Sequence, residues 1–203
     1  MSMVMTLHAV RDETRRRLLH YPPLIWRVLD PADDSLYESA CDEFRRNTTS
    51  FWGRLFGRGV RSVDAEPLVL SEGEGLVADL DKSWHGLNFL FTGSDEEGNF
   101  PLDFLITGGT TLDHVDVGYG PARVFAPEQV AAIWASFSVL SDDALLARYD
   151  GSAMKALEIY PDIWGSGSDD ISSREYLRDN LASLRAAVAE TARRRFALVA
   201  AMS

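Results

Sequence analysis

Apolar and polar positions form regular patterns in the first quarter of the chain, and these patterns predict a strand followed by helices. Residues 3–10 alternate between apolar and polar side chains, which is typical of a short strand. Residues 12–19 predict a short helix, because two prolines follow shortly after and cannot continue it. A longer helix is expected to follow Asp33 or Asp34 and to run to Arg46.

Residues 76–92 carry the clearest helical pattern. Their apolar side chains recur at offsets of four, three and four, at Leu80, Trp84, Leu87 and Phe91. Gly93 and a polar turn come next, which favours the end of a helix at this point. The spacing therefore predicts one helix over the whole of residues 76–92.

The second half of the chain mixes short strands with helices. Residues 100–106 and 122–125 read as strands. Helices are expected from Pro127, after Ser141 and over 152–160. Ser173 is expected to cap a long final helix, whose apolar stripe contains Leu177, Leu181, Leu184 and Val188 and extends to Val199. We therefore expect an α+β fold: a helix-rich single domain over residues 1–203, with a small sheet of short strands and a long C-terminal helix.

Composition narrows the class of protein. The chain has 203 residues, with 20 Lys and Arg against 31 Asp and Glu, so its formal charge is -11. Such a chain repels nucleic acid unless it carries a concentrated basic face, and we expect no nucleic-acid partner. The absence of a long apolar run or a secretory pattern predicts a cytoplasmic protein that does not enter a membrane. The single cysteine, Cys41, excludes an internal disulfide.

One basic stretch interrupts this acidic balance. Residues 45–61 contain arginines interleaved with Phe51, Trp52 and Phe56, and lack Asp and Glu. A basic aromatic segment suits a membrane surface, a phosphate or an acidic partner. Its glycines instead favour a helix end followed by a loop, and we prefer this second interpretation.

The predicted helix over 76–92 also carries polar side chains on one face. Asp81, His85 and Asn88 are spaced four and three residues apart, so they would line up. An aspartate one turn before a histidine can orient the imidazole and raise its basicity, as a general base requires. The alternative is a hydrogen-bonded surface packed beneath a loop, which we favour because no nucleophile accompanies the pair.

Metal and phosphate sites find weaker support. Asp113, His114 and Asp116 offer oxygen and imidazole ligands beside Gly118. Their spacing matches no calcium loop, and such residues commonly cap backbone groups in turns. The glycines at 118 and 120 are not followed by a helix, as a dinucleotide site would need. We expect neither a metal nor a cofactor.

Four segments of the chain resemble the YfbM-like family, a bacterial family of domains of unknown function. The resemblance is strongest at Leu80-Asp81-Lys82-Ser83-Trp84-His85-Gly86-Leu87-Asn88-Phe89-Leu90. It also covers residues 3–10, 118–123 and 158–164. Asn88 stands where many members are expected to have histidine. The resemblance implies a compact α+β domain and brings no catalytic residues.

The polar and aromatic residues of these segments define the candidate site. If they converge, they form one pocket with both charge signs, made of Asp81, Lys82, Trp84, His85, Tyr119, Arg123, Glu158, Tyr160 and Asp162. Tyrosine and tryptophan supply rigid contact area, and nearby acids can meet a cation.

Two functions follow from this pocket. The first is a non-enzymatic binding or interaction domain that takes a basic protein or a small molecule, in the manner of an acidic immunity-type partner. The alternative is a small-molecule hydrolase or lyase that uses His85 and Asp81 as an acid–base pair. The sequence leaves the oligomeric state open.

Overall fold

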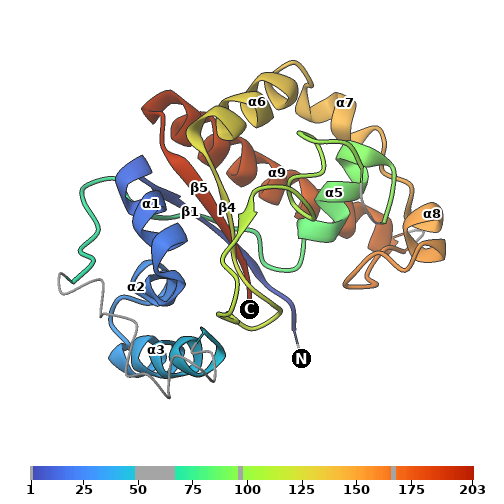
Figure 1. Cartoon of the computed structure of the whole chain (residues 1–203). Coiled ribbons are helices and arrows are strands. Elements are labelled where there is room, and N and C mark those ends of the chain that lie inside the picture. The colour runs from blue at the N-terminus through green and yellow to red at the C-terminus, as the bar shows by residue number, and fades with distance from the viewer. Residues whose placement is uncertain (1, 49–66, 96–97, 166–167) are drawn as a thin grey trace, which may run out of the picture.

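A computed structural model of the chain describes residues 2–48, 67–95, 98–165 and 168–203. Among these residues, a five-stranded antiparallel sheet runs through the middle of the molecule (Figure 1), with the strand order β2-β1-β5-β4-β3. The first strand, β1 (Met5–Val10), pairs with the last, β5 (Ala197–Met202), so that Met5 faces Met202 and Val10 faces Ala197. The α+β class predicted from the sequence is confirmed.

The sheet separates two apolar cores, because successive side chains of a strand point to opposite faces. Met5 and Leu7 belong to the larger core, together with side chains of the helices from α5 to α9. Val10 and Val199 belong to the second core, which lies beneath the helices near the N-terminus. Figure 1 shows these two groups of helices on either side of the strands.

The elements predicted for the first quarter of the chain are confirmed. Strand β1 is followed by helix α1 (Asp12–His20) and by a short 3₁₀ turn over Pro22–Ile25. Helix α2 (Trp26–Leu29) comes next, and helix α3 (Asp34–Thr48) begins at one of the two predicted aspartates. Most of the basic stretch 45–61 lies outside the described residues, which end at residue 48 and resume at 67.

The single helix predicted over 76–92 is wrong for its first half. Residues Gly75–Asp79 form strand β2, which pairs with β1, and helix α5 begins only at Trp84. Asp81 has a positive φ of 45°, which a helix cannot include. Pairing with β1 supplies hydrogen bonds from a segment distant in sequence, and helical spacing alone cannot anticipate them. Gly93 does end the helix, in the left-handed conformation.

The strand predicted over 100–106 is also wrong, because this segment forms consecutive turns. The amides of Ile106 and Thr107 bond back to the carbonyl of Asp103. The Arg123 guanidinium then donates to the carbonyls of Phe104, at 3.0 Å, and Leu105, at 2.7 Å. A charged group that donates hydrogen bonds to several carbonyls stabilises such a coil. Those carbonyls then have partners other than a neighbouring strand.

The predictions for residues 122–160 hold with small shifts of boundary. Strand β4 (Arg123–Phe125) pairs with β5 and with the two-residue strand β3 (Thr110–Thr111). Helix α6 (Pro127–Ser138) starts at the expected proline, and Ser141 caps helix α7 (Asp142–Leu146). Helix α8 (Gly151–Ala156) ends earlier than predicted, before Glu158, which has a φ of 53°.

The long final helix is confirmed, although its two ends differ from the prediction. Helix α9 (Ser168–Arg194) begins before Ser173, so Ser173 is not its cap. Leu177, Leu181, Leu184 and Val188 are buried as predicted. Val199 is buried in strand β5 instead, because the chain leaves the helix at Arg195, where φ is 57°. No helix in the described parts of the chain combines the length and apolar character needed to cross a membrane.

Candidate functional site

Two aromatic side chains at one end of the sheet hold the segment that precedes β1. Trp84 begins α5, and its indole Nε1 donates to the carbonyl of Met3 at 3.3 Å. The Tyr160 hydroxyl accepts a hydrogen bond from the Met3 amide at 3.0 Å. The Trp84 and Tyr160 rings stack, with their centroids 6.1 Å apart. Three of the resembling segments therefore meet here, at Met3, Trp84 and Tyr160.

His85 lies in the same cluster, and backbone groups use both of its ring nitrogens. The Tyr160 amide donates to Nδ1 at 3.0 Å, so Nδ1 is the acceptor. Nε2 then carries the proton and donates to the carbonyl of Asp95 at 2.6 Å. The imidazole also stacks on Trp84, at 5.0 Å between centroids and 8° between planes. These contacts fix the orientation of the ring and leave neither nitrogen available to a substrate.

Asp81 does not orient His85, which corrects the predicted pair. Because Asp81 precedes the helix, it is not one helical turn before His85. Its carboxylate accepts a hydrogen bond from the Tyr176 hydroxyl of α9 at 2.9 Å. The same hydroxyl accepts from the Lys82 amide at 3.1 Å. Asp81 and Lys82 therefore attach the turn before α5 to the final helix.

The environment of Tyr176 keeps its hydroxyl protonated. Burial, followed by the hydrogen bond and the charge of Asp81, raises the pKa of Tyr176 well above its usual range. A phenol that keeps its proton donates a hydrogen bond and cannot act as a general base. The Tyr176–Asp81 contact is therefore suited to binding and to holding the two segments together.

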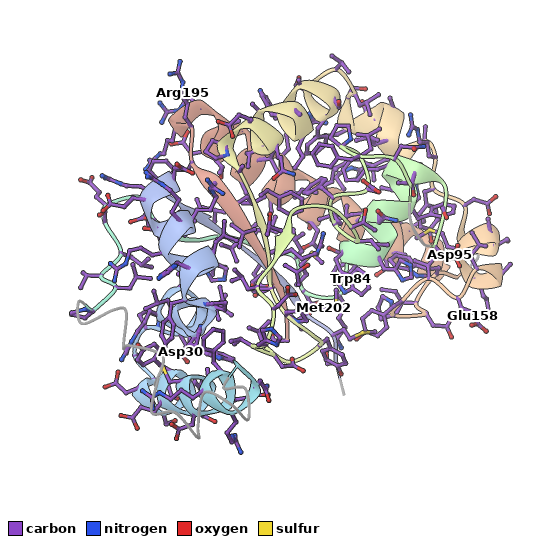
Figure 2. All side chains as sticks on the ribbon, viewed as in Figure 1. Asp30, Trp84, Asp95, Glu158, Arg195 and Met202 are labelled. Atoms are coloured by element: carbon purple, nitrogen blue, oxygen red, sulfur yellow. The ribbon has the colours of Figure 1, made fainter. Side chains whose placement is uncertain are left out.

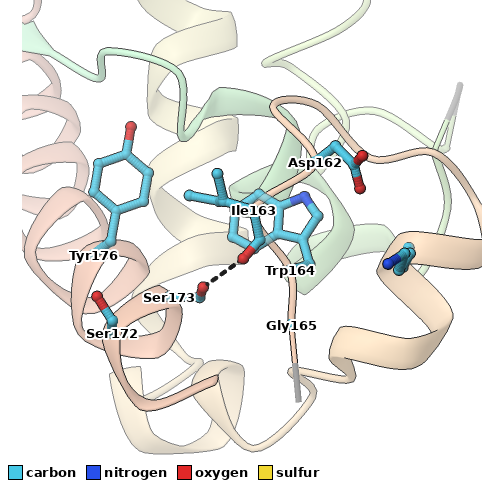
Figure 3. A pocket seen from close by; sticks show the side chains of 8 residues that line it. Asp162, Ile163, Trp164, Gly165, Ser172, Ser173 and Tyr176 are labelled. Carbon is cyan, nitrogen blue, oxygen red and sulfur yellow. Dashed lines mark hydrogen bonds between the residues drawn. The ribbon is translucent and has the colours of Figure 1, made fainter. Parts of the chain in front are cut away.

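A hollow of about 640 Å³ opens next to Tyr176 (Figure 3). We call it the α8–α9 hollow, and it is lined by Lys155, Asp162, Ile163, Trp164, Gly165, Ser172, Ser173 and Tyr176. The wall over 162–165 is held from both sides. Trp164 donates through Nε1 to the carbonyl of Ile159 at 2.6 Å, and Ser173 donates to the carbonyl of Ile163 at 2.8 Å. Asp162 and Ile163 remain exposed.

The structure brings together most, but not all, of the residues predicted for one pocket. Trp84, His85 and Tyr160 form the aromatic cluster, and Asp81 and Lys82 are bonded to Tyr176, which lines the α8–α9 hollow together with Asp162. These groups share one region, but the first three are committed to internal contacts.

The three remaining predicted residues have other surroundings. Glu158 is exposed in the turn after α8 (Figure 2). Tyr119 lies in a turn whose amide donates to the carbonyl of Met202 at 2.9 Å, and 39% of its surface is exposed. Arg123 belongs to β4, where its guanidinium binds the carbonyls of the 104–108 coil. Burial lowers the pKa of Arg123 to about 10.

Residues of α8 and α9 that line the hollow were missed by the sequence analysis. Tyr176 and Ser173 are three residues apart, next to the predicted apolar stripe that begins at Leu177. Polar side chains at the edge of a buried stripe lie where a helix meets its neighbours. The three-residue spacing of Ser173 and Tyr176 beside the stripe could therefore have indicated that both line a site. Lys155 carried no comparable signal, because a lysine on a short helix is commonly only solvated.

The loop with Asp113, His114 and Asp116 has a structural explanation. The Asp116 carboxylate accepts from the amides of Gly118, at 2.7 Å, and Gly120, at 3.1 Å. The His114 ring lies edge-on to Phe44, with 6.3 Å between the centroids. Within the described parts of the chain, no three His, Cys, Asp or Glu side chains are grouped as a metal site requires.

Comparison with known proteins identifies the family and the fold. A model of the family described as "Domain of unknown function (DUF1877)" matches residues 1–200. The crystal structure of YfbM from Escherichia coli, a protein of unknown function, is similar over 98% of this chain and 99% of that one. The TM-score is 0.61 and the sequence identity is 16%, a level at which the likeness concerns the fold. No curated protein matches the sequence. This chain therefore belongs to the DUF1877 family and has a YfbM-like α+β fold.

Proposed function

We propose that this protein is a non-enzymatic binding domain whose α8–α9 hollow receives a cationic side chain of a basic partner protein. The observation that carries the proposal is the composition of the hollow. An exposed carboxylate, Asp162, stands with the half-exposed apolar side chain of Ile163 and the phenol of Tyr176 around a space of about 640 Å³. An arginine or lysine side chain pairs an apolar stem with a cationic head, and this lining offers a partner to each part.

The charge of the whole chain supports a basic partner. At a net charge of -11, the protein attracts cations from a distance and steers a basic surface towards itself. This is the behaviour expected of an acidic immunity-type protein, which masks a basic partner by covering it.

The contacts of the candidate catalytic groups favour binding over catalysis. A general base needs a nitrogen or carboxylate that can reach a substrate proton. The two nitrogens of His85 are bonded to the backbone, and Asp81 is bonded to Tyr176. Ser173 donates to the carbonyl of Ile163 and has no base as its hydrogen-bond partner among the described residues. The hydrolase or lyase alternative therefore finds no support at this site.

Lys155 lines the same hollow, and its positive charge repels a bound cation. The two charged residues of the hollow therefore have opposite expected effects on binding. Removing the charge of Asp162 should weaken cation binding, whereas removing the charge of Lys155 should strengthen it. Ion pairs at exposed sites contribute little, so each effect is expected to be about two- to fivefold in affinity.

The experiment compares a short peptide of glycine, serine and arginine with the same peptide carrying citrulline, which keeps the shape of arginine without its charge. We expect the arginine peptide to bind more tightly to the wild-type protein and the preference to fall in Asp162→Asn. It should rise in Lys155→Met. Glu128→Gln is the matched control, because Glu128 is an exposed acid at the start of α6 and does not line the hollow. Equal weakening by Glu128→Gln and Asp162→Asn would mean that only the general charge of the protein attracts the peptide.

A further inference from the structure

A second hollow lies on the other side of the sheet, between strand β1 and helices α2 and α3. It has a volume of about 450 Å³, and we call it the His8 hollow. Trp26, Val28 and Leu36 supply apolar walls from the two helices, and Thr6 and His8 of β1 supply its polar groups. This volume falls within the range of small-molecule sites, which are mostly apolar with a few placed polar groups.

His8 has a hydrogen-bonding group that the described part of the protein does not use. The side chain is only 4% exposed, and its Nε2 lies 3.2 Å from the Thr6 hydroxyl. Nδ1 has no hydrogen-bond partner among the described protein groups. A buried polar atom without a partner is destabilising, and nearly all such atoms in folded proteins are paired. The Thr6–His8 pair therefore has capacity left for one further polar group, which reaches Nδ1 when the imidazole turns towards the hollow, since neighbouring atoms cover Nδ1 in this structure.

Charge restricts what that group can be. Burial lowers the pKa of His8 to about 4, so the imidazole is uncharged near neutral pH. Asp30, which is exposed and also lines the hollow, repels an anion. A cation that entered as far as His8 would leave water without gaining a charged partner there. A hydroxyl group is both donor and acceptor, so it can pair with the Thr6–His8 pair in either tautomer of the imidazole.

We propose that the His8 hollow is a binding site for a small uncharged molecule that has an apolar body and a single hydroxyl group. The apolar body packs against Trp26, Val28 and Leu36. The hydroxyl group hydrogen-bonds to the Thr6–His8 pair at the sheet.

This site is independent of the proposed cation site. Figure 2 shows Asp30 beside α2 and α3 and Glu158 beside α8, on opposite sides of the sheet. Binding at the His8 hollow can therefore fail or succeed without any bearing on binding at the α8–α9 hollow.

The test uses 4-ethylphenol as the probe, with ethylbenzene and 4-ethylbenzoate as analogues of matched size. We expect 4-ethylphenol to shift the NMR signals of His8 and Val28 and to bind about tenfold more tightly than ethylbenzene, the factor expected for one hydrogen bond to a buried group. The benzoate should bind more weakly than either. Equal affinities for 4-ethylphenol and ethylbenzene, or no shift at His8 and Val28, would overturn the proposal.

Two variants assign the effect to the hollow. His8→Leu replaces the unused polar group by an apolar one, so the preference for 4-ethylphenol over ethylbenzene should disappear while ethylbenzene still binds. Leu36→Trp adds bulk from α3 and should abolish binding of both molecules. Circular dichroism and the NMR spectrum of each variant without probe establish that it is folded. A preference that survives in folded His8→Leu would contradict the role of His8.

Discussion

A β-carbon on Gly86 would lie 2.6 Å from the indole ring of Trp164 and 2.9 Å from Leu177 of α9. Helix α5 therefore touches both the wall of the α8–α9 hollow and the final helix through a residue that has no side chain. The glycine within the Trp84-His85-Gly86 motif is explained by this close approach.

Gly86→Ala should destabilise the protein. Alanine is favoured over glycine inside a helix by about 1 kcal/mol. Overpacking in a core costs about 1–3 kcal/mol, and a contact of 2.6 Å with the buried Trp164 ring forces neighbouring side chains or the helix to shift. We expect a net loss in the free energy of unfolding, measured by urea titration. Trp164→Phe, which shortens the ring, should make the effect of Gly86→Ala smaller. A more stable Gly86→Ala protein would show that the two helices can separate without cost.

The tautomer of His85 is a second test. Because Nδ1 accepts from Tyr160 and Nε2 donates to Asp95, the ring should be protonated on Nε2 alone. Nitrogen-detected NMR distinguishes the two nitrogens directly. His85→Phe should cost about 1–3 kcal/mol in stability, because it leaves the Tyr160 amide without its partner. A proton found on Nδ1 would contradict the contacts described for this ring.

The raised pKa of Tyr176 predicts that the protein loses stability at alkaline pH. Its pKa is raised in the folded protein above the ordinary 10.0, so above about pH 10 the unfolded chain loses the phenolic proton while the folded protein keeps it. The unfolded state then binds fewer protons, and the free energy of unfolding falls as pH rises. Tyr176→Phe should flatten this part of the pH profile. An unchanged alkaline slope in Tyr176→Phe would assign the loss to other groups.

The lowered pKa of His8 predicts that the protein loses stability at acidic pH. Its pKa is lowered from 6.5 to about 4 by burial, so between these values the unfolded chain binds a proton that the folded protein does not. Stability should fall as pH decreases from 6.5 towards 4, by about 3 kcal/mol in total, because each pKa unit corresponds to roughly 1.36 kcal/mol. Carboxylates also titrate in this pH range and change the stability of the wild type and of His8→Leu alike. The measurement is therefore the difference in the free energy of unfolding between these two proteins at each pH. Parallel curves would show that His8 does not titrate as a buried group.

The sequence predicted the fold where local signals decide the structure. Ser141 caps α7 and Pro127 starts α6, because both act within one turn of their own helix. The prediction from sequence failed where hydrogen bonds to distant segments decide the structure. Residues 76–79 stand directly before the helical stripe that starts at Leu80, but pairing with β1 makes them a strand, and the carbonyls of 104 and 105 accept hydrogen bonds from Arg123, which is distant in sequence.

The contacts among the candidate site residues could be predicted only in part, because several of them join segments that are distant in sequence. Trp84, His85 and Tyr160 were grouped through the resemblance, and they do meet. The role of Asp81 was not predictable, since its partner Tyr176 is 95 residues away and the predicted helix placed Asp81 beside His85 instead. His8 falls within the strand predicted over residues 3–10, and nothing in the neighbouring sequence indicates that its Nδ1 has no partner among the described protein groups.

The most direct test of the proposed function is to map where the arginine peptide binds, by NMR on the labelled wild-type protein. The account predicts that the amide signals of Gly165, Ser172 and Tyr176 move with the arginine peptide, and that at the same concentration they move less with the citrulline peptide. Largest shifts outside the α8–α9 hollow, or identical shifts with both peptides, would contradict it.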